Sequence, residues 1–300
     1  MINSSTIVDA LDMNIQGIYQ DGLQSWDEEY SKVFNLMDSD KQSEKTSYFS
    51  GFTVVPVKPE GTAATYDTIL PGIPETFTHD TYALGYEITE EAIEDNQKTP
   101  ETFNKLPNAL IRSGMESVET LSFNVLNNGF STNGYDGVPL FSTAHPTLDG
   151  STQSNRPSTD VDLGVTSLTA ALTAIDGFTD ERGLKRPMKA GMVLVPSASW
   201  AIVNELLDSE YKPYTANNEK NAIQSKTMQG MVGHYITDTD AWFVLSQKKD
   251  HRLLFWWRVR MPNKLRTSTD ADTTNLKHLL RFRCSAGYDH WFGTYASSGG

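Results

Sequence analysis

The feature that most constrains this fold is a long amphipathic helix pattern over residues 99–129. Thr99 suits the N-cap, and Pro100 suits the first helical position, where its missing N–H leaves no bond unmade. Residues that form one apolar stripe then recur every three or four positions: Phe103, Leu106, Leu110, Gly114, Val118, Leu121 and Val125. A helix of this length measures roughly 40 Å. It needs an equally long surface to pack on, which indicates an extended, flat molecule.

Three residue types predict details of this helix. Pro107 lies in the first turns and should kink the helix or delay its regular start, because proline lacks the amide hydrogen. Gly114 should let another backbone approach closely. Gly129 should end the helix in the left-handed conformation.

Composition narrows the class of protein. The 300 residues suffice for one large domain or two ordinary ones, and the net charge of −13 disfavours non-specific binding to DNA or to an anionic membrane. The single cysteine, Cys284, excludes an intrachain disulfide and a cysteine-based zinc cluster. Neither a signal-peptide pattern nor a membrane-spanning apolar run is present. We therefore expect a soluble, acidic, intracellular protein with no membrane partner.

Residues 1–50 are predicted to form an N-terminal arm. Its apolar residues form a weak helical stripe and one short patch, and a polar run of turn-forming residues follows over 38–47. Patches this small and scattered cannot fold around themselves. We expect the arm to be disordered or to pack on neighbouring surfaces.

Residues 51–85 are predicted to form an extended ribbon. The segments 52–57 and 77–84 are rich in β-branched and aromatic residues, and a segment with several prolines and glycines separates them. Near the tip, Tyr66, Ile69 and Leu70 have nothing local to bury them. An ordinary surface hairpin and a projecting loop that contacts another subunit are equally compatible with this pattern.

The second half mixes helices and strands without a βαβ rhythm, which predicts an α+β fold. A loop rich in glycine and proline occupies 134–155, and a helix is predicted over 163–178. A buried strand follows over 192–196, and the polar segment 210–229 is predicted to be a mobile loop. The remainder is β-rich.

The sequence contains none of the enzymatic motifs that we searched for, among them nucleotide-binding glycine loops, zinc-protease motifs and hydrolase nucleophile motifs. Strand alternation places Cys284 with Phe282 on one face, away from the neighbouring arginines, which favours a structural cysteine. His145 is predicted to bond backbone groups of its loop, since Pro146 prevents a helical metal-ligand pair with Asp149. We predict no catalytic residue, metal site or cofactor.

One segment resembles a known family. The run Asp136-Gly-Val-Pro-Leu-Phe-Ser-Thr-Ala-His-Pro146, followed by Ser154-Asn155, resembles the signature of Mu-like prophage major head subunits, the gpT family of major capsid proteins. The order of elements along the chain is similar too. The signature residues of this loop are Asp136, Gly137, Leu140, Phe141, His145 and Pro146.

The resemblance implies the capsid fold named after phage Hong Kong ninety-seven. It implies an N-arm over 1–50, a projecting E-loop over 51–85, and a P-domain over 86–189 that contains a spine helix at 99–129 and the signature loop at 134–155. An A-domain would follow over 190–275, with 210–229 near the centres of hexamers and pentamers, and closing strands over 276–300.

The resemblance also implies a function. The chain would self-assemble into hexamers and pentamers of an icosahedral shell around double-stranded DNA, without reading its sequence. Implied partners are a portal, a maturation protease and a scaffold, which is either a separate protein or one already cleaved from a precursor. The implied location is the virion capsid, assembled in the bacterial host cytoplasm. The alternatives are another phage structural protein, such as a decoration or tail-tube protein, and an uncharacterised enzyme.

Overall fold

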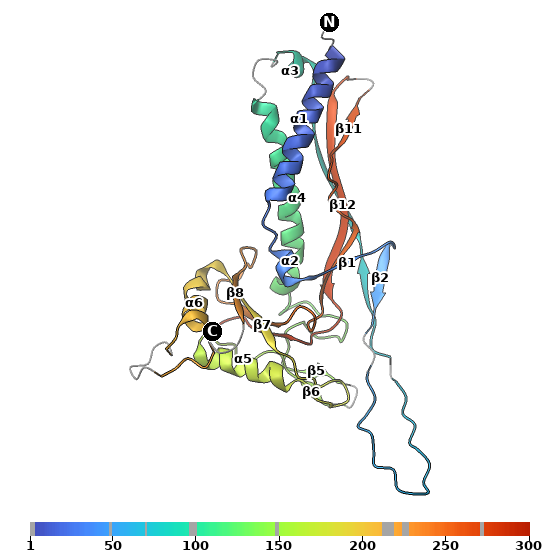
Figure 1. Ribbon diagram of the computed structural model, residues 1–300, viewed down its shortest axis with the longest axis vertical. Helices are drawn as coiled ribbons and strands as arrows, with labels where there is room; N and C mark the ends of the chain where they lie inside the picture. The colour runs from blue at the N-terminus through green and yellow to red at the C-terminus, as the bar shows by residue number, and fades with distance from the viewer. Residues whose placement is uncertain are drawn as a thin grey trace.

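The computed structural model describes residues 4–47, 50–69, 71–95, 101–147, 150–211, 219–223, 228–270 and 273–300. The molecule is elongated (Figure 1). Long helices and long strands run lengthwise through one part of it, and a smaller body lies beside one end of that part. From the same end, residues 51–69 project as an extended loop. Within the described residues, no helix is long and apolar enough to cross a membrane.

Helices in the described residues have the following bounds: α1 Ser4–Ser25, α2 Tyr30–Val33, α3 Glu90–Asp95, α4 Glu101–Asn127, α5 Val165–Gly177, the 3-10 helix η1 Ser197–Ser199, and α6 Trp200–Asp208. The strands are β1 Asn35–Asp38, β2 Ser43–Thr46, β3 Glu75–Thr78, β4 Asp80–Ile88, β5 His145–Pro146, β6 Thr152–Gln153, β7 Ala190–Val195, β8 Gln229–Val232, β9 Trp242–Ser246, β10 Leu253–Val259, β11 Arg266–Thr269, β12 Leu276–Tyr288 and β13 Thr294–Ser297.

The predicted long helix is α4. The residues Thr99 and Pro100, predicted to begin it, lie outside the described residues, and the helix is continuous through Pro107 rather than starting after it. A Cβ atom at Gly114 would lie 2.6 Å from Leu280 Cδ2 of β12, so the glycine admits a side chain rather than the predicted backbone. Gly129 is not in the left-handed region. It is needed for space, because a Cβ there would lie 2.7 Å from the Phe141 ring.

The surface that α4 packs on is a long sheet. Its strands follow the order β1-β10-β12-β11, and β4 pairs with the other edge of β12. Side chains alternate along β12, so that Leu280, Phe282 and Cys284 are buried on the helix side while Arg281 and Arg283 lie on the opposite face. The prediction for Cys284 thus agrees with the structure, and burial raises the pKa of its thiol to about 12.

The N-terminal arm packs on its own chain. Its helix α1 packs along α4, with Ile15 and Tyr19 fully buried (Figure 1). The Gln16 amide donates to Leu265 O at 3.2 Å and accepts from Leu265 N at 2.9 Å. Further along, β1 pairs in parallel with β10. Of the two predicted alternatives, disorder and packing on neighbouring surfaces, the described residues of the arm show the second, because the apolar patches find their cover on the long helix and the sheet.

The smaller body contains a second sheet in the order β13-β9-β7-β8, with α5 and α6 packed against it. The range 190–275 therefore divides between two sheets, since β10 and β11 belong to the long one. The range 276–300 divides in the same way between β12 and β13. A single hydrophobic core cluster nevertheless runs through both parts.

Part of the segment predicted to be a mobile loop, 210–229, is tied to α6. Asn221 is buried, and its amide donates to Leu206 O at 2.8 Å and to Ser209 O at 3.1 Å. Residues 212–218 and 224–227 lie outside the described part of the chain.

A buried carboxylate joins the arm to the long helix. Glu119 of α4 is 1% exposed, and its two carboxylate oxygens accept the backbone N–H groups of Glu29 and Tyr30, each at 2.8 Å. These amides lie at the start of α2, where N–H groups have no partner inside the helix. Burial raises the pKa of Glu119 to about 7, although the two amide hydrogen bonds act in the opposite direction.

We predict that Glu119→Gln removes a pH dependence of stability. The folded chain holds this proton more tightly than the unfolded chain, because the pKa rises from 4.5 to about 7 on folding. Relative to the variant, the native free energy of unfolding should fall by up to about 3 kcal/mol as the pH rises through that window. Urea unfolding of both unassembled chains at several pH values measures the difference. Parallel pH curves would contradict the prediction.

Candidate functional site

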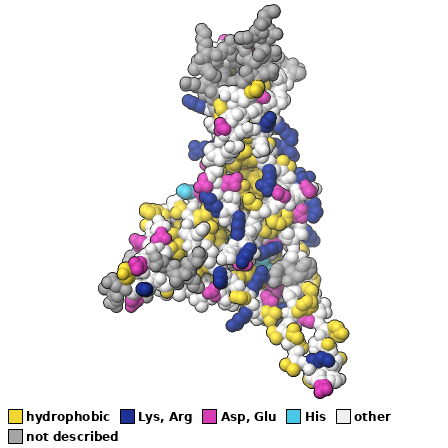
Figure 2. Space-filling model, viewed as in Figure 1, with side chains coloured by type: hydrophobic (Ala, Val, Ile, Leu, Met, Phe, Trp, Pro, Cys, Tyr) yellow, Lys and Arg dark blue, Asp and Glu magenta, His cyan; other side chains and the backbone are white. Residues whose placement is uncertain are grey.

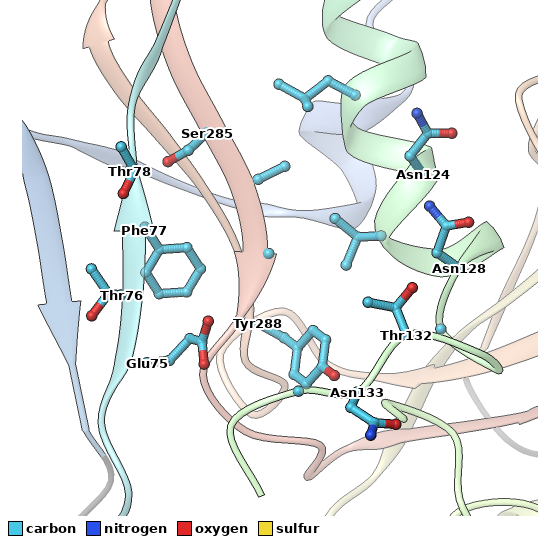
Figure 3. A pocket seen from close by; sticks show the side chains of 16 residues that line it. Glu75, Thr76, Phe77, Thr78, Asn124, Asn128, Thr132, Asn133, Ser285 and Tyr288 are labelled. Atoms are coloured by element: carbon cyan, nitrogen blue, oxygen red, sulfur yellow. The ribbon is translucent and has the colours of Figure 1, made fainter. Parts of the chain in front are cut away.

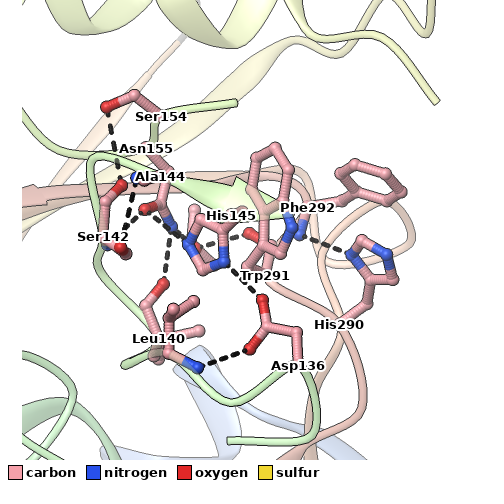
Figure 4. A network of polar contacts seen from close by, with 12 residues as sticks. Asp136, Leu140, Ser142, Ala144, His145, Ser154, Asn155, His290, Trp291 and Phe292 are labelled. Atoms are coloured by element: carbon pink, nitrogen blue, oxygen red, sulfur yellow. Dashed lines mark hydrogen bonds and ion pairs between the residues drawn. The ribbon is translucent and has the colours of Figure 1, made fainter. Parts of the chain in front are cut away.

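The signature loop forms a buried polar network around His145 (Figure 4). His145 Nδ1 lies 2.6 Å from a carboxylate oxygen of Asp136, and His145 Nε2 lies 3.1 Å from Asn155 Oδ1. All three side chains are almost completely buried. On one side the imidazole ring stacks on Trp291, with ring centroids 4.6 Å apart. Sequence reasoning predicted backbone partners for His145, whereas the partners are side chains.

Asn155 extends this network to the rest of the smaller body. Its Oδ1 accepts the Ser142 amide at 2.9 Å, and its Nδ2 donates to Leu140 O at 2.7 Å and to Thr294 Oγ1 at 3.2 Å. Its backbone carbonyl accepts the Ala296 amide of β13 at 3.1 Å. Asn155 therefore connects both ends of the signature loop to the last strand. Asn155 belongs to the sequence motif, but no local pattern around it predicts its position in the network.

The other signature residues shape the loop. Gly137 has a φ of 82°, which favours glycine, and the neighbouring Val138 amide donates to Asp136 at 3.3 Å. Leu140 and Phe141 are fully buried. Phe141 packs on the end of α4, and Pro146 lies in β5, paired with Thr152 of β6. The buried residues of the signature loop thus connect α4 to the second sheet.

In contrast to the buried signature loop, the projecting loop exposes its apolar side chains. Residues that share high exposure are Phe52, Val54, Val55, Val57, Tyr66 and Ile69. Val57 is 92% exposed and Tyr66 is 93% exposed. Figure 2 shows hydrophobic side chains gathered on this projection. The exposure of Tyr66 and Ile69 agrees with the prediction, and Leu70 lies outside the described residues. The first limb of the loop adds four exposed apolar residues that the pattern at the tip does not indicate. These four were predicted to lie in a strand.

The predicted strand over residues 52–57 does not form. Regular pairing occurs only at the base of the loop, where β2 pairs with β3. Between them, the described backbone contains one hydrogen bond, from Thr62 N to Pro59 O at 3.3 Å. The prolines of this segment cannot donate to a ladder, which explains why a β-branched sequence stays unpaired.

A cluster of hydrogen bonds and one ion pair joins the two limbs of the projecting loop near their base. The Asp67 carboxylate accepts the Thr53 amide at 2.8 Å and the Thr53 hydroxyl at 2.9 Å. It also pairs with Arg182 at 2.8 Å, and the same guanidinium donates to Thr68 O at 2.5 Å. The Thr53 amide and the Arg182 guanidinium hold the pKa of Asp67 well below its ordinary value. These contacts therefore hold the base of the loop, whereas the apolar side chains beyond the base remain exposed.

The described residues contain no group of three or more His, Cys, Asp or Glu side chains that could hold a metal ion. His145 is enclosed by Asp136, Asn155 and Trp291, so it has no free face for a substrate. The projecting loop, with its exposed apolar side chains, is therefore the candidate functional surface.

We predict that Arg182→Ala loosens the base of this loop. The variant removes one of the groups that keep Asp67 ionised and in place, so hydrogen exchange at the Thr53 amide should become faster. In the native chain, protection of that amide should persist until the pH falls well below 3.8, the ordinary Asp pKa. Mass spectrometry of exchanged peptides measures both effects.

Arg112→Ala is the matched control for this experiment. Arg112 is an exposed arginine on α4 whose nearest carboxylate, Glu116, lies 3.7 Å away. Equal exchange at Thr53 in both variants would contradict the role of Arg182.

We predict that His145→Phe destabilises the fold by about 3 kcal/mol, because it leaves the Asp136 carboxylate buried without its partner. The phenyl ring preserves a flat surface against Trp291, so the loss reports on the hydrogen bonds. Denaturant unfolding measures it. In a double-mutant cycle with Asp136→Asn, the second substitution should cost less than it does alone, and strict additivity would refute the coupling.

Comparison with known proteins identifies the architecture. No curated protein sequence matches the chain. Among solved structures, the procapsid protein of bacteriophage JBD30 superposes with a TM-score of 0.55 at 15% identity, covering 98% of this chain and 76% of that one. A virus-like particle from Pyrococcus furiosus gives 0.56 at 12% identity, covering 95% and 98%. Microbacterium phage Oxtober96 gives 0.57 at 9% identity, covering 91% of each chain.

These similarities confirm the predicted α+β class and the Hong Kong ninety-seven-type capsid fold. The sequence profile of one family, described as phage capsid protein, matches residues 74–297. This range runs from just before β3 to the end of β13, so it includes α4, the signature loop, the second sheet and every strand of the long sheet except β1. The chain belongs to the phage capsid protein family.

Proposed function

We propose that this chain is the major capsid subunit of a tailed phage or prophage, repeated in hexamers and pentamers of an icosahedral shell. The observation that carries the proposal is the projecting loop, whose six exposed apolar side chains have no cover within the described chain. Full burial of one such side chain contributes about 1.5–3 kcal/mol. Covering the loop with copies of the chain itself would supply much of the energy of assembly.

The slender shape supports the same proposal. The long helix and the long sheet form a thin layer, and the smaller body lies beside it (Figure 1). We assign the long layer and the signature loop to the P-domain, and most of the smaller body to the A-domain. The loop over 51–69 is the E-loop, and α1 with the segment that follows it is the N-arm.

The Mu-like gpT subfamily is a finer proposal, which rests on the signature loop. Its residues form one buried network centred on His145 and Asn155. A motif whose members depend on each other for hydrogen bonds is retained as a unit, so its presence favours descent from head subunits that contain it.

The proposed partners follow from the shell. The shell would enclose double-stranded DNA without reading its sequence, and the net charge of −13 suits a wall that does not hold DNA tightly. A separate scaffold, a portal and a maturation protease complete the proposal. Assembly would take place in the bacterial host cytoplasm, and the product would be part of the virion.

Two alternatives make different predictions. A decoration or tail-tube protein would form trimers or stacked rings rather than closed shells. An enzyme would need convergent titratable groups in a pocket. A hollow along α4 from Ala109 to Asn124 is lined instead by amide, hydroxyl and apolar groups, with Arg112 and Glu116 as its charged residues. We propose that the chain is not an enzyme.

We predict that deletion of residues 58–70 abolishes assembly without unfolding the subunit. The deletion removes the tip of the loop, including Tyr66, while the paired strands at its base remain. Negative-stain microscopy and sedimentation velocity of the purified proteins measure the outcome. The native chain should give uniform shells or capsomers, and the deletion should give folded monomers. Shells formed by the deletion variant would refute the role of the loop.

A further inference from the structure

Two hollows of the described chain differ in the charge of their lining. One, of about 370 Å³, lies between the end of α4, β3 and the end of β12, and its one charged lining residue is Glu75 (Figure 3). The other, of about 280 Å³, lies between α2, the second sheet and the turn that joins β9 to β10. The described residues that line it include Lys32 and Lys248 but no Asp or Glu. We call this second hollow the cationic cavity.

The two lysines of the cationic cavity are incompletely neutralised. The Lys248 ammonium donates to Ser31 O, and it has no carboxylate partner in the described part of the chain. Burial therefore lowers the pKa of Lys248. Lys32 pairs with Asp27 at 2.7 Å, but that carboxylate is 84% exposed and does not line the cavity. In a chain with 38 acidic and 25 basic side chains, such a lining departs from the average charge.

Two buried polar side chains line the same cavity and have unused hydrogen-bonding capacity. Ser246 is 2% exposed, and its Oγ has no hydrogen-bond partner in the described chain. His251 is 3% exposed, and its Nδ1 accepts the Leu253 amide at 3.4 Å. Burial lowers the pKa of His251 to about 4, so the ring is neutral and its proton lies on Nε2. No hydrogen bond between described residues uses that N–H.

The remaining polar side chains of the lining, Gln229 and Gln247, are exposed and can donate amide N–H groups. Donors in this cavity therefore come from α2, from two strands of the second sheet and from the turn. Buried polar groups are normally hydrogen-bonded, so this arrangement calls for a ligand that brings acceptor oxygens.

A compact oxyanion supplies both the acceptors and the missing negative charge. A phosphate group has at least three strong acceptor oxygens that point in different directions, whereas a carboxylate has two in one plane. Donors that converge from several elements match the phosphate group better. Hydrogen bonds from ammonium groups to such an anion are charge-assisted, which makes them stronger than bonds between neutral groups. The volume of about 280 Å³ also leaves room for bound waters.

We propose that the cationic cavity is a phosphate-binding site. The proposal goes beyond the proposed function and does not depend on shell assembly. Phosphate bound to Lys32, Lys248 and Ser246 would connect α2 of the arm with the second sheet of the smaller body. Two sources carry this chemical group, free inorganic phosphate and a nucleic acid.

Isothermal titration calorimetry of the unassembled full-length chain tests the site. We expect inorganic phosphate to bind, and sodium chloride of equal ionic strength to give no binding heat. Lys248→Gln should weaken phosphate binding by about tenfold, because it removes a charge-assisted hydrogen bond. Ser246→Ala should also weaken it, and this variant should remain folded because the hydroxyl that it removes has no partner in the described chain. Thermal unfolding in chloride checks the folding of each variant.

Lys264→Gln is the matched control, because Lys264 is an exposed lysine outside the cavity. This variant should bind phosphate as the native chain does. The inference would be overturned if the native chain bound no phosphate, if Lys248→Gln and Lys264→Gln bound it equally well, or if acetate bound as tightly as phosphate.

Thymidine monophosphate distinguishes the two sources of the phosphate group. Tighter binding of this nucleotide than of inorganic phosphate would support the site and indicate a nucleic acid as its natural ligand. Weaker or equal binding, with inorganic phosphate still bound, would support the site and indicate free phosphate.

Discussion

The packing of α4 on β12 is the constraint that the rest of the structure depends on. A helix of 27 residues lies along a strand of 13 residues, and Gly114 lets Leu280 approach the helix axis. Three other segments are attached to this pair. α1 lies on α4, α2 is held by Glu119, and Phe141 of the signature loop fills the space at Gly129.

A molecule built on one long helix and one long sheet has much surface for its volume. Its core must follow the length of the helix, so fewer apolar residues can be enclosed than in a spherical domain of equal size. The exposed apolar residues of the projecting loop are among those that the core does not enclose. In a monomer they would favour aggregation, whereas the proposed shell would let each copy cover those of its neighbour. The same packing would then account for both the shape and the proposed assembly.

The sequence predicted the long helix well because its stripe is periodic over many turns, and burial of that stripe decides where the helix lies. The projecting ribbon was predicted less well. Val54, Val55 and Val57 have strand propensity, but prolines interrupt the ladder, and propensity alone cannot pair a strand. For the arm, the sequence left disorder and packing on neighbouring surfaces open. Its apolar stripe is too weak for an independent unit, yet Ile15 and Tyr19 are buried once α4 provides a partner.

By itself, the sequence determined the α+β class, the long helix, the signature loop and the lack of local cover for Tyr66 and Ile69 at the tip of the projecting segment. Each depends on local periodicity, on turn chemistry or on a motif. Only the tertiary structure decided that His145 bonds Asp136 and Asn155, that the arm lies on its own subunit, and that Glu119 holds the start of α2. The physical reason is that these features join residues far apart along the chain, and their positions follow from how the elements pack rather than from any local preference.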